Sequence, residues 1–131
     1  MQLKLSTDYA IQIVLYIAMK NRKVSLDELA ENLNISRQHV YKFCGKLSNG
    51  EIIYIHDHTK DKFSLAKYPS EITMFDVLKS MENTIKINLC LEEEGYCRRF
   101  ATKSCPVRRF YYELQSKIEE ELIKKTIQDL L

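Results

Sequence analysis

Apolar residues recur at helical spacing in the first third of the chain and predict three helices. Over residues 6–21 they form two stripes, so we expect a helix covered on two sides, with Ser6 or Thr7 as its N-cap and a second subunit as one cover. Ser25 precedes apolar residues at positions 26, 29, 30 and 33, and Ser36 opens a further helix that ends at Gly50. Two short helices joined by a tight polar turn are typical of a helix-turn-helix.

Shorter apolar segments follow and predict two strands, over residues 51–56 and 62–66, with a polar loop between them. A helix-turn-helix followed by a β-hairpin is typical of a winged helix, in which the hairpin loop forms the wing. Thr73 with Asp76 predicts the start of another helix, and Pro106 predicts the start of a long one. The expected fold class is therefore mainly α with a small β-hairpin, a winged helix-turn-helix plus a long dimerisation helix.

The long helix carries an apolar stripe over about four turns. The stripe consists of Val107, Phe110, Tyr111, Leu114, Ile118 and Leu122. No segment of the same chain is an obvious partner for it, so we expect it to form a homodimer interface. We divide the chain into a winged helix-turn-helix DNA-binding domain over residues 1–68 and a cysteine loop with dimerisation helices over residues 69–131, which together form one compact body.

The outer face of the second helix of the motif is polar and presents donors and rings that suit base edges and phosphates. Its candidate DNA contacts are Ser36, Arg37, Gln38, His39, Tyr41, Lys42 and Lys46. The wing adds His58, Lys60 and Lys62, which suit the DNA backbone or minor groove. A solvated helix surface has the same residue types, but the hairpin that follows favours DNA binding.

Composition narrows the class of protein. Of the 131 residues, 45% are apolar and 29% are charged, which is the balance of a folded domain, and a net charge of +2 means that DNA affinity must come from a local patch. No apolar run approaches membrane-spanning length and no signal-peptide pattern opens the chain, so we expect a cytoplasmic protein with reduced thiols and no membrane contact. We expect no enzyme, because three glycines in all leave little material for a phosphate loop and no nucleophile–base arrangement is visible.

Three of the four cysteines, Cys90, Cys97 and Cys105, lie within sixteen residues at a spacing of C-x6-C-x7-C. Thiolates are soft ligands that select zinc, copper(I) or iron–sulfur clusters, and three of them leave one coordination position open. Zinc is disfavoured because its sites usually contain a close C-x2–4-C pair, whereas incidental thiols or a disulfide remain open. His56 and His58 are weaker metal candidates, since histidines at this spacing on a hairpin are more often exposed without metal.

Taken in order, these segments resemble the family of winged-helix iron–sulfur regulators that includes the cluster-assembly regulator IscR and the nitric-oxide-sensitive repressor NsrR. The resemblance covers nearly the whole chain, through MQLKLSTDYAIQIVLYIAM, ISRQHVYKFCGKLSNGEII, PSEITMFDVLKSME, the three cysteines and TIQDLL. The opening and the Ser36–His39 stretch are closer to NsrR. The resemblance implies a homodimeric repressor that binds a double-stranded DNA operator, with its affinity set by a cluster that senses nitric oxide, redox state or cluster status.

The resemblance also implies the cluster ligands, on Cys90, Cys97 and Cys105, with [4Fe-4S] favoured over [2Fe-2S]. The cluster-assembly branch has a histidine ligand three residues after the third cysteine, but Arg108 stands there and an arginine cannot ligate iron. In the nitric-oxide branch an aspartate of the other subunit's first helix fills this place, and Asp8 is at the matching position. A first-turn carboxylate is also explained by the helix dipole alone.

Two departures from the family pattern keep an alternative open. The predicted wing has no glycine and contains two acids, Asp57 and Asp61, where the family carries an Arg-Gly…Gly-Gly run. The cysteine spacing is also one or two residues longer than is usual. The alternative is a cluster-independent winged-helix repressor that responds to a protein or small-molecule partner.

Overall fold

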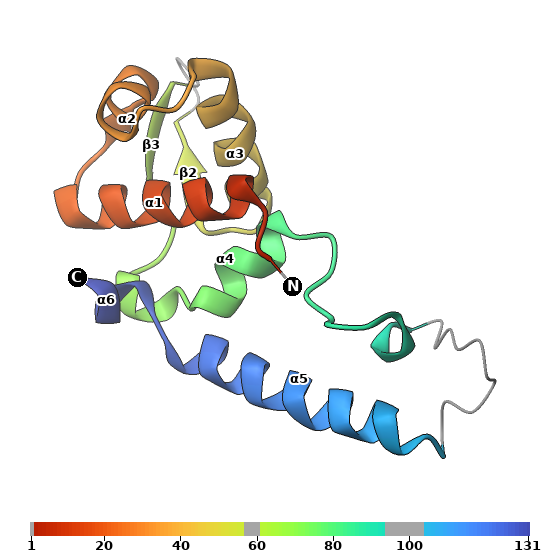
Figure 1. Cartoon of the computed structure of the whole chain (residues 1–131). Helices are drawn as coiled ribbons and strands as arrows, with labels where there is room; N and C mark the ends of the chain where they lie inside the picture. Colours follow the sequence, from red (N-terminus) through yellow and green to blue (C-terminus); the bar gives the residue numbers. More distant parts are fainter. Residues whose placement is uncertain (1, 57–60, 94–103) are drawn as a thin grey trace.

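The computed structural model describes residues 2–56, 61–93 and 104–131 and has the expected mainly helical architecture with a small antiparallel sheet (Figure 1). The first part contains α1 (Leu5–Lys20), β1 (Val24–Ser25), α2 (Leu26–Leu33), α3 (Arg37–Asn49), β2 (Ile53–Ile55) and β3 (Lys62–Leu65). The second part contains the 3-10 helix η1 (Pro69–Glu71), α4 (Met74–Met81), the 3-10 helix η2 (Leu89–Leu91), α5 (Pro106–Lys124) and α6 (Ile127–Leu130). Among these helices, none is long and apolar enough to cross a membrane.

The helix-turn-helix consists of α2, a short turn and α3, and its helix starts are the predicted ones. The Ser25 hydroxyl accepts a hydrogen bond from the Glu28 amide at 3.0 Å, and the Ser36 hydroxyl accepts one from the His39 amide at 3.2 Å. Asn34 ends α2 in the left-handed conformation, with φ of 54°, which asparagine tolerates better than most residues. These side-chain caps fix where α3 begins and therefore which of its side chains face outward.

The sheet has three strands in the order β1-β3-β2, one more than the predicted hairpin. The extra strand, β1, pairs antiparallel with β3 through Val24↔Phe63 and Ser25↔Lys62. A strand of two residues is too short to give a detectable alternation, which is why the sequence pattern does not predict it. Its effect is to fasten the start of α2 to the base of the wing, where the Leu26 amide donates to the Asp61 carbonyl at 2.7 Å.

One hydrophobic core lies around α1, which packs against α2, α3, α4, α6 and β3. Ile13 and Ile17 are almost completely buried, and Ile11 on the other stripe packs partly buried against the same core. Both stripes therefore make contacts within the chain, but Ile11 and Leu15 are only partly buried, so the expected cover by a second subunit stays a prediction. The predicted N-cap is wrong, because α1 begins after Lys4 and Thr7 lies buried inside its first turn.

Gly50 follows the end of α3 as predicted, but for a different reason. Its φ of −83° is not left-handed, and the left-handed residue is Glu51, with φ of 60°. A Cβ atom on Gly50 would collide with the Ser80 Oγ and lie 3.1 Å from the Ser80 Cβ. Glycine is therefore needed here for the close approach of α3 to α4, and not for its backbone freedom.

The C-terminal residues return to the start of α4. Thr73 and Thr126 form an antiparallel bridge, and each opens a capping box, with Asp76 and Asp129 respectively. The Ile127 side chain is fully buried. This return holds the C-terminal end of α5 beside α4.

The expectation that the apolar stripe of α5 has no partner in its own chain is wrong for its C-terminal half. Gln115 is only 3% exposed, and its side chain accepts from the Ile87 amide at 2.8 Å and donates to the Ile85 carbonyl at 3.0 Å. Ile118 and Leu122 lie half-buried on the same side of α5, which packs against α4. In the N-terminal half of the stripe, Val107 and Phe110 remain exposed and Tyr111 is half-buried.

Candidate DNA interface and cluster site

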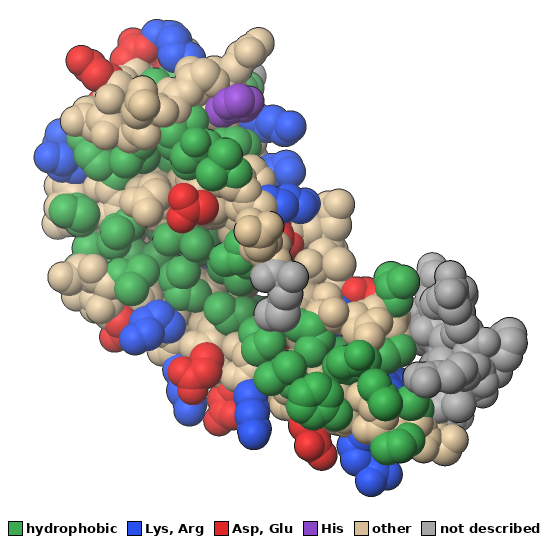
Figure 2. All heavy atoms as spheres, in the orientation of Figure 1, with side chains coloured by type: hydrophobic (Ala, Val, Ile, Leu, Met, Phe, Trp, Pro, Cys, Tyr) green, Lys and Arg blue, Asp and Glu red, His purple; other side chains and the backbone are tan. Residues whose placement is uncertain are grey.

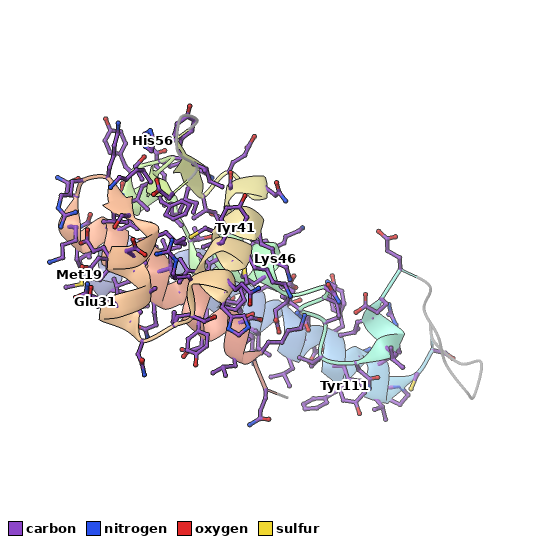
Figure 3. All side chains as sticks on the ribbon, turned by 90° about the horizontal axis from the view of Figure 1, so that it is seen from above. Met19, Glu31, Tyr41, Lys46, His56 and Tyr111 are labelled. Carbon is purple, nitrogen blue, oxygen red and sulfur yellow. The ribbon has the colours of Figure 1, made fainter. Side chains whose placement is uncertain are left out.

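The face of α3 that points away from the core carries most of the predicted DNA contacts. Val40, Phe43, Cys44 and Leu47 are buried on its inner face. Arg37, Gln38, His39, Tyr41 and Lys42 are exposed, and Lys46 is half-buried. Tyr41 and Lys46 extend outward from α3 (Figure 3). The structure thus brings the predicted contacts of α3 together on one helix face, as recognition of a DNA groove requires.

Several of these side chains already have partners within the chain. Arg37 forms an ion pair with Asp27 of α2, and both side chains are 65% exposed. The His39 ring stacks on Phe43, with ring centroids 5.6 Å apart and an interplanar angle of 7°. The Ser36 hydroxyl caps α3. Contacts to DNA from Ser36, Arg37 or His39 would therefore compete with existing contacts, whereas Tyr41 and Lys42 are exposed for direct use.

The wing is described only at its base. Lys62 is exposed on β3, whereas His58 and Lys60 lie outside the described residues. The His56 Nε2 lies 3.0 Å from the Ser64 Oγ, and its ring meets Tyr54 edge-on at 4.9 Å. These contacts give His56 a structural role at the base of the wing.

A polar cluster fastens α2 to α1. The Tyr16 hydroxyl donates to Glu28 at 2.7 Å, and Arg22 makes two hydrogen bonds to the same carboxylate at 2.9 Å each. The bonds from Arg22 and then Tyr16 lower the pKa of Glu28 to about 2, against an ordinary value of 4.5. The pKa of Tyr16 is raised in turn, chiefly by its hydrogen bond to Glu28. Glu28 is thus ionised at neutral pH and holds the first helix of the motif in place.

Two of the three clustered cysteines lie on elements that pack against each other. Cys90 is in η2 and Cys105 is the N-cap of α5; both are half-buried, and η2 contacts α5. Cys97 lies outside the described residues. Cys44 is different, because it is fully buried in the core and burial raises the pKa of its thiol to about 12. Cys44 is therefore a residue of the hydrophobic core.

The donor chemistry of this segment fits an iron–sulfur cluster, since thiolates are its usual ligands. Cys90 and Cys105 would supply two of them. Within residues 2–56, 61–93 and 104–131, however, no three His, Cys, Asp or Glu side chains gather as a metal site. Asp8 is exposed on the first turn of α1 and does not join Cys90 and Cys105 in one such group. A ligand role for Asp8 would therefore need a second subunit.

Sequence reasoning missed the contacts between the cysteine segment and α1. The buried Thr7 hydroxyl donates to Glu82 at 2.7 Å, and the Lys4 ammonium lies 3.9 Å from the same carboxylate. Glu82 follows α4 and begins the segment that leads to Cys90. Gln115, as a polar residue within an apolar stripe, was a usable signal for a buried hydrogen-bonding role, whereas nothing local in the sequence indicates the Thr7–Glu82 bond.

Comparison with known proteins assigns the chain to a family. The family model Rrf2, described as "Iron-dependent Transcriptional regulator", matches residues 3–131. A helix-turn-helix transcriptional regulator of Aquifex aeolicus is 32% identical over 124 residues, covering 94% of this chain and 86% of its own length. The transcriptional regulator NsrR of Shouchella clausii is 27% identical over 134 residues, covering 100% and 89%.

Solved structures share the fold. CymR of B. subtilis, titled the global cysteine regulator, superposes with a TM-score of 0.78 at 20% identity, covering 99% of this chain and 95% of its own. IscR of T. potens gives a TM-score of 0.74 at 17% identity, covering 99% and 85%. The family and these relatives are regulators of transcription, as the helix-turn-helix led us to expect, and not enzymes. This chain therefore belongs to the Rrf2 family of winged-helix transcriptional regulators.

Proposed function

We propose that this regulator is a homodimeric, cytoplasmic repressor whose affinity for a double-stranded DNA operator depends on a bound iron–sulfur cluster. The proposed ligands are Cys90, Cys97 and Cys105, with Asp8 of the second subunit, and [4Fe-4S] is favoured over [2Fe-2S]. The signal is nitric oxide, redox state or the supply of clusters. In this proposal residues 1–68 bind DNA, and residues 69–131 bind the cluster and dimerise.

The observation that carries the proposal is the position of the two described thiols. Cys90 and Cys105 lie 15 positions apart in sequence but on two elements in contact, η2 and the start of α5. This end of the molecule is well separated from α3 in Figure 1. The chain thus has one end suited to binding a soft metal centre and another suited to binding DNA.

The dimer is supported by exposed apolar side chains around the same elements. Phe110 is 58% exposed, Val107 42% and Leu114 37% on α5, and Leu89 of η2 is 64% exposed. Figure 2 shows apolar side chains gathered over this region. A contiguous exposed apolar patch marks an interface, and a second copy of α5 has the complementary stripe.

The mechanism follows from where the proposed ligands lie. When bound, the cluster supplies a centre that nitric oxide or oxidants can attack. The Asp8 carboxylate would join one subunit to the cysteine segment of the other. A carboxylate binds the iron of a cluster less firmly than a thiolate does. Loss of that bond would leave the first turn of α1 held by contacts within its own chain, such as the hydrogen bond from Thr7 to Glu82. The two recognition helices, about one DNA turn apart, would then change their relative position.

Anaerobic purification tests the cluster part of the proposal. We expect brown protein with visible charge-transfer absorption and stoichiometric iron and sulfide. The variant Asp8→Ala should lose iron to a chelator about fivefold faster. Asp27→Ala is the matched control, since Asp27 is likewise an exposed first-turn aspartate, and it should behave like the parent.

Colourless protein without iron after anaerobic reconstitution would overturn the cluster proposal. The chain would then be the cluster-independent repressor that responds to a protein or small-molecule partner. Equal release rates for Asp8→Ala and the parent would remove Asp8 from the ligand set alone.

A further inference from the structure

Arg108 links two of the cysteine positions. It is the third residue of α5, whose N-cap is Cys105 and whose first residue is Pro106. Its Nε donates a hydrogen bond of 3.1 Å to the carbonyl oxygen of Cys90, 18 residues earlier in the chain. One half-buried side chain thus connects the turn that carries the first cysteine to the helix turn that follows the third.

The turn that carries Cys90 has little stability of its own. Helix η2 spans only Leu89–Leu91, its N-cap Asn88 makes no side-chain cap bond, and Leu89 is 64% exposed. Isolated 3-10 turns have poor hydrogen-bond geometry and are marginal without tertiary contacts. A charge-assisted hydrogen bond from α5 is therefore a substantial part of what can hold this turn in place.

We propose that Arg108 is a positioning residue that holds the Cys90 turn against the first turn of α5 before any cluster is bound. Fixing two ligand positions in advance reduces the conformational entropy that cluster binding must overcome. A guanidinium is suited to this role because it donates in a fixed plane, stays charged and does not compete with the thiols for iron. The inference rests on the proposed function, since Cys90 matters as a ligand only if a cluster is bound.

Hydrogen–deuterium exchange on the whole apo chain, under anaerobic reducing conditions, tests the positioning directly. Arg108→Met keeps the length of the side chain and removes the donor. We expect peptides that cover residues 88–92 to exchange about tenfold faster in this variant, while peptides from the C-terminal half of α5 stay at the parent rate. Arg109→Met is the matched control, because Arg109 is an exposed neighbour in the same turn of α5, and it should exchange like the parent.

The second measurement is the rate of iron release from reconstituted protein to a chelator. We expect about fivefold faster release from Arg108→Met than from Arg109→Met or the parent. Unchanged exchange in Arg108→Met would overturn the positioning role. A brown parent whose Arg108→Met variant releases iron at the parent rate would overturn the inference alone, whereas a parent that binds no iron would overturn the proposed function.

Discussion

Arg37 is the clearest case of a proposed DNA contact whose side chain already has a partner within the chain. It pairs with Asp27, and both side chains are well exposed to solvent. An exposed ion pair contributes about 0.2–1 kcal/mol, so phosphate can displace Asp27 but has to compensate for the lost pair. A carboxylate beside the recognition helix also repels the DNA backbone at short range. We therefore expect Asp27 to lower the DNA affinity that we attribute to the basic residues of α3.

Replacing Asp27 with Asn should tighten operator binding about two- to fivefold, because Arg37 becomes free and one negative charge is removed from the interface. Fluorescence anisotropy of labelled operator DNA at fixed salt measures the change. Glu120→Gln is the matched control, since Glu120 forms an equally exposed ion pair with Lys124 on α5, remote from α3, and should leave affinity unchanged. Weaker binding by Asp27→Asn would instead mean that Asp27 orients Arg37 for DNA.

Glu28 gives the chain a pH-dependent contribution to stability. Its pKa is about 2 in the folded protein against an ordinary value of 4.5, chiefly because of its hydrogen bonds from Arg22 and Tyr16, so the folded state favours the ionised carboxylate. The stabilisation is complete above the ordinary value and is lost as pH falls through the folded value. Glu28→Gln should therefore lower the free energy of unfolding by about 1 kcal/mol at pH 7, because glutamine can still accept a hydrogen bond but lacks the charge that strengthens it.

Urea unfolding of the parent and Glu28→Gln at a series of pH values measures this difference. The gap between the two should narrow as pH falls from about 5 towards about 2, because protonation removes the ionic part of the bond in the parent. Asp129, whose pKa is lowered by its bonds to Thr126, is present in both proteins and cancels in the comparison. A gap that stays constant with pH would contradict the assignment.

At the scale of elements, the sequence was most informative where a residue that favours a helix start is followed by apolar residues at helical spacing. Ser25 and Ser36 fix the starts of α2 and α3, and Pro106 stands at the first position of α5. These signals are local, so they do not depend on what packs against the helix. Strand β1 and the close approach at Gly50 depend on distant residues, and local periodicity therefore could not predict them.

The candidate site was predictable to a similar extent. The residue types on the outer face of α3 follow from helical periodicity, and the cysteines follow from their grouping in the chain. The partners of Arg37 and Arg108, which decide what these side chains can do, lie 10 and 18 residues away. Contacts at such separations are set by tertiary packing and leave no periodic signal.

Gln115 holds residues 85–87 against α5 through two hydrogen bonds to their backbone. Replacing it with Ala should cost about 2 kcal/mol in the free energy of unfolding, because the Ile87 amide and the Ile85 carbonyl lose their partner in a part-buried setting. Amide exchange at Ile87 should quicken as well. Gln12→Ala, at an exposed position of α1, is the control, and an equal cost for both variants would rule out the role assigned to Gln115.

For the whole molecule, dimerisation through the N-terminal half of α5 makes a specific prediction. Phe110 and Tyr112 are almost equally exposed, at 58% and 59%, but only Phe110 belongs to the apolar stripe. Phe110→Lys should weaken the dimer at least a hundredfold, since a charge would be buried at the centre of the interface, while Tyr112→Lys should leave it intact. Analytical ultracentrifugation measures both, and a dimer that survives Phe110→Lys would place the interface elsewhere.

The two ends of the molecule are joined by contacts that a cluster could influence. Arg108 holds the Cys90 turn, Gln115 holds the segment that follows α4, and Glu82 binds Thr7 in α1, which packs against α3. Coupling between the two ends through these contacts requires two states of the molecule that cluster binding and DNA binding favour differently. Affinity for operator DNA, measured with and without the cluster, therefore decides whether the two ends are coupled.

Operator affinity with and without the cluster is the most direct test of the central claim. Operator DNA would be selected from genomic fragments with anaerobically reconstituted protein, and its binding followed by anisotropy at one salt concentration. Cys97→Ala supplies a cluster-free control with the same α3 surface. We predict at least a tenfold difference in operator affinity between the cluster-loaded and the apo parent. For Cys97→Ala, we predict the same affinity before and after the reconstitution treatment. Equal affinity of the loaded and apo parent would contradict control of DNA binding by the cluster.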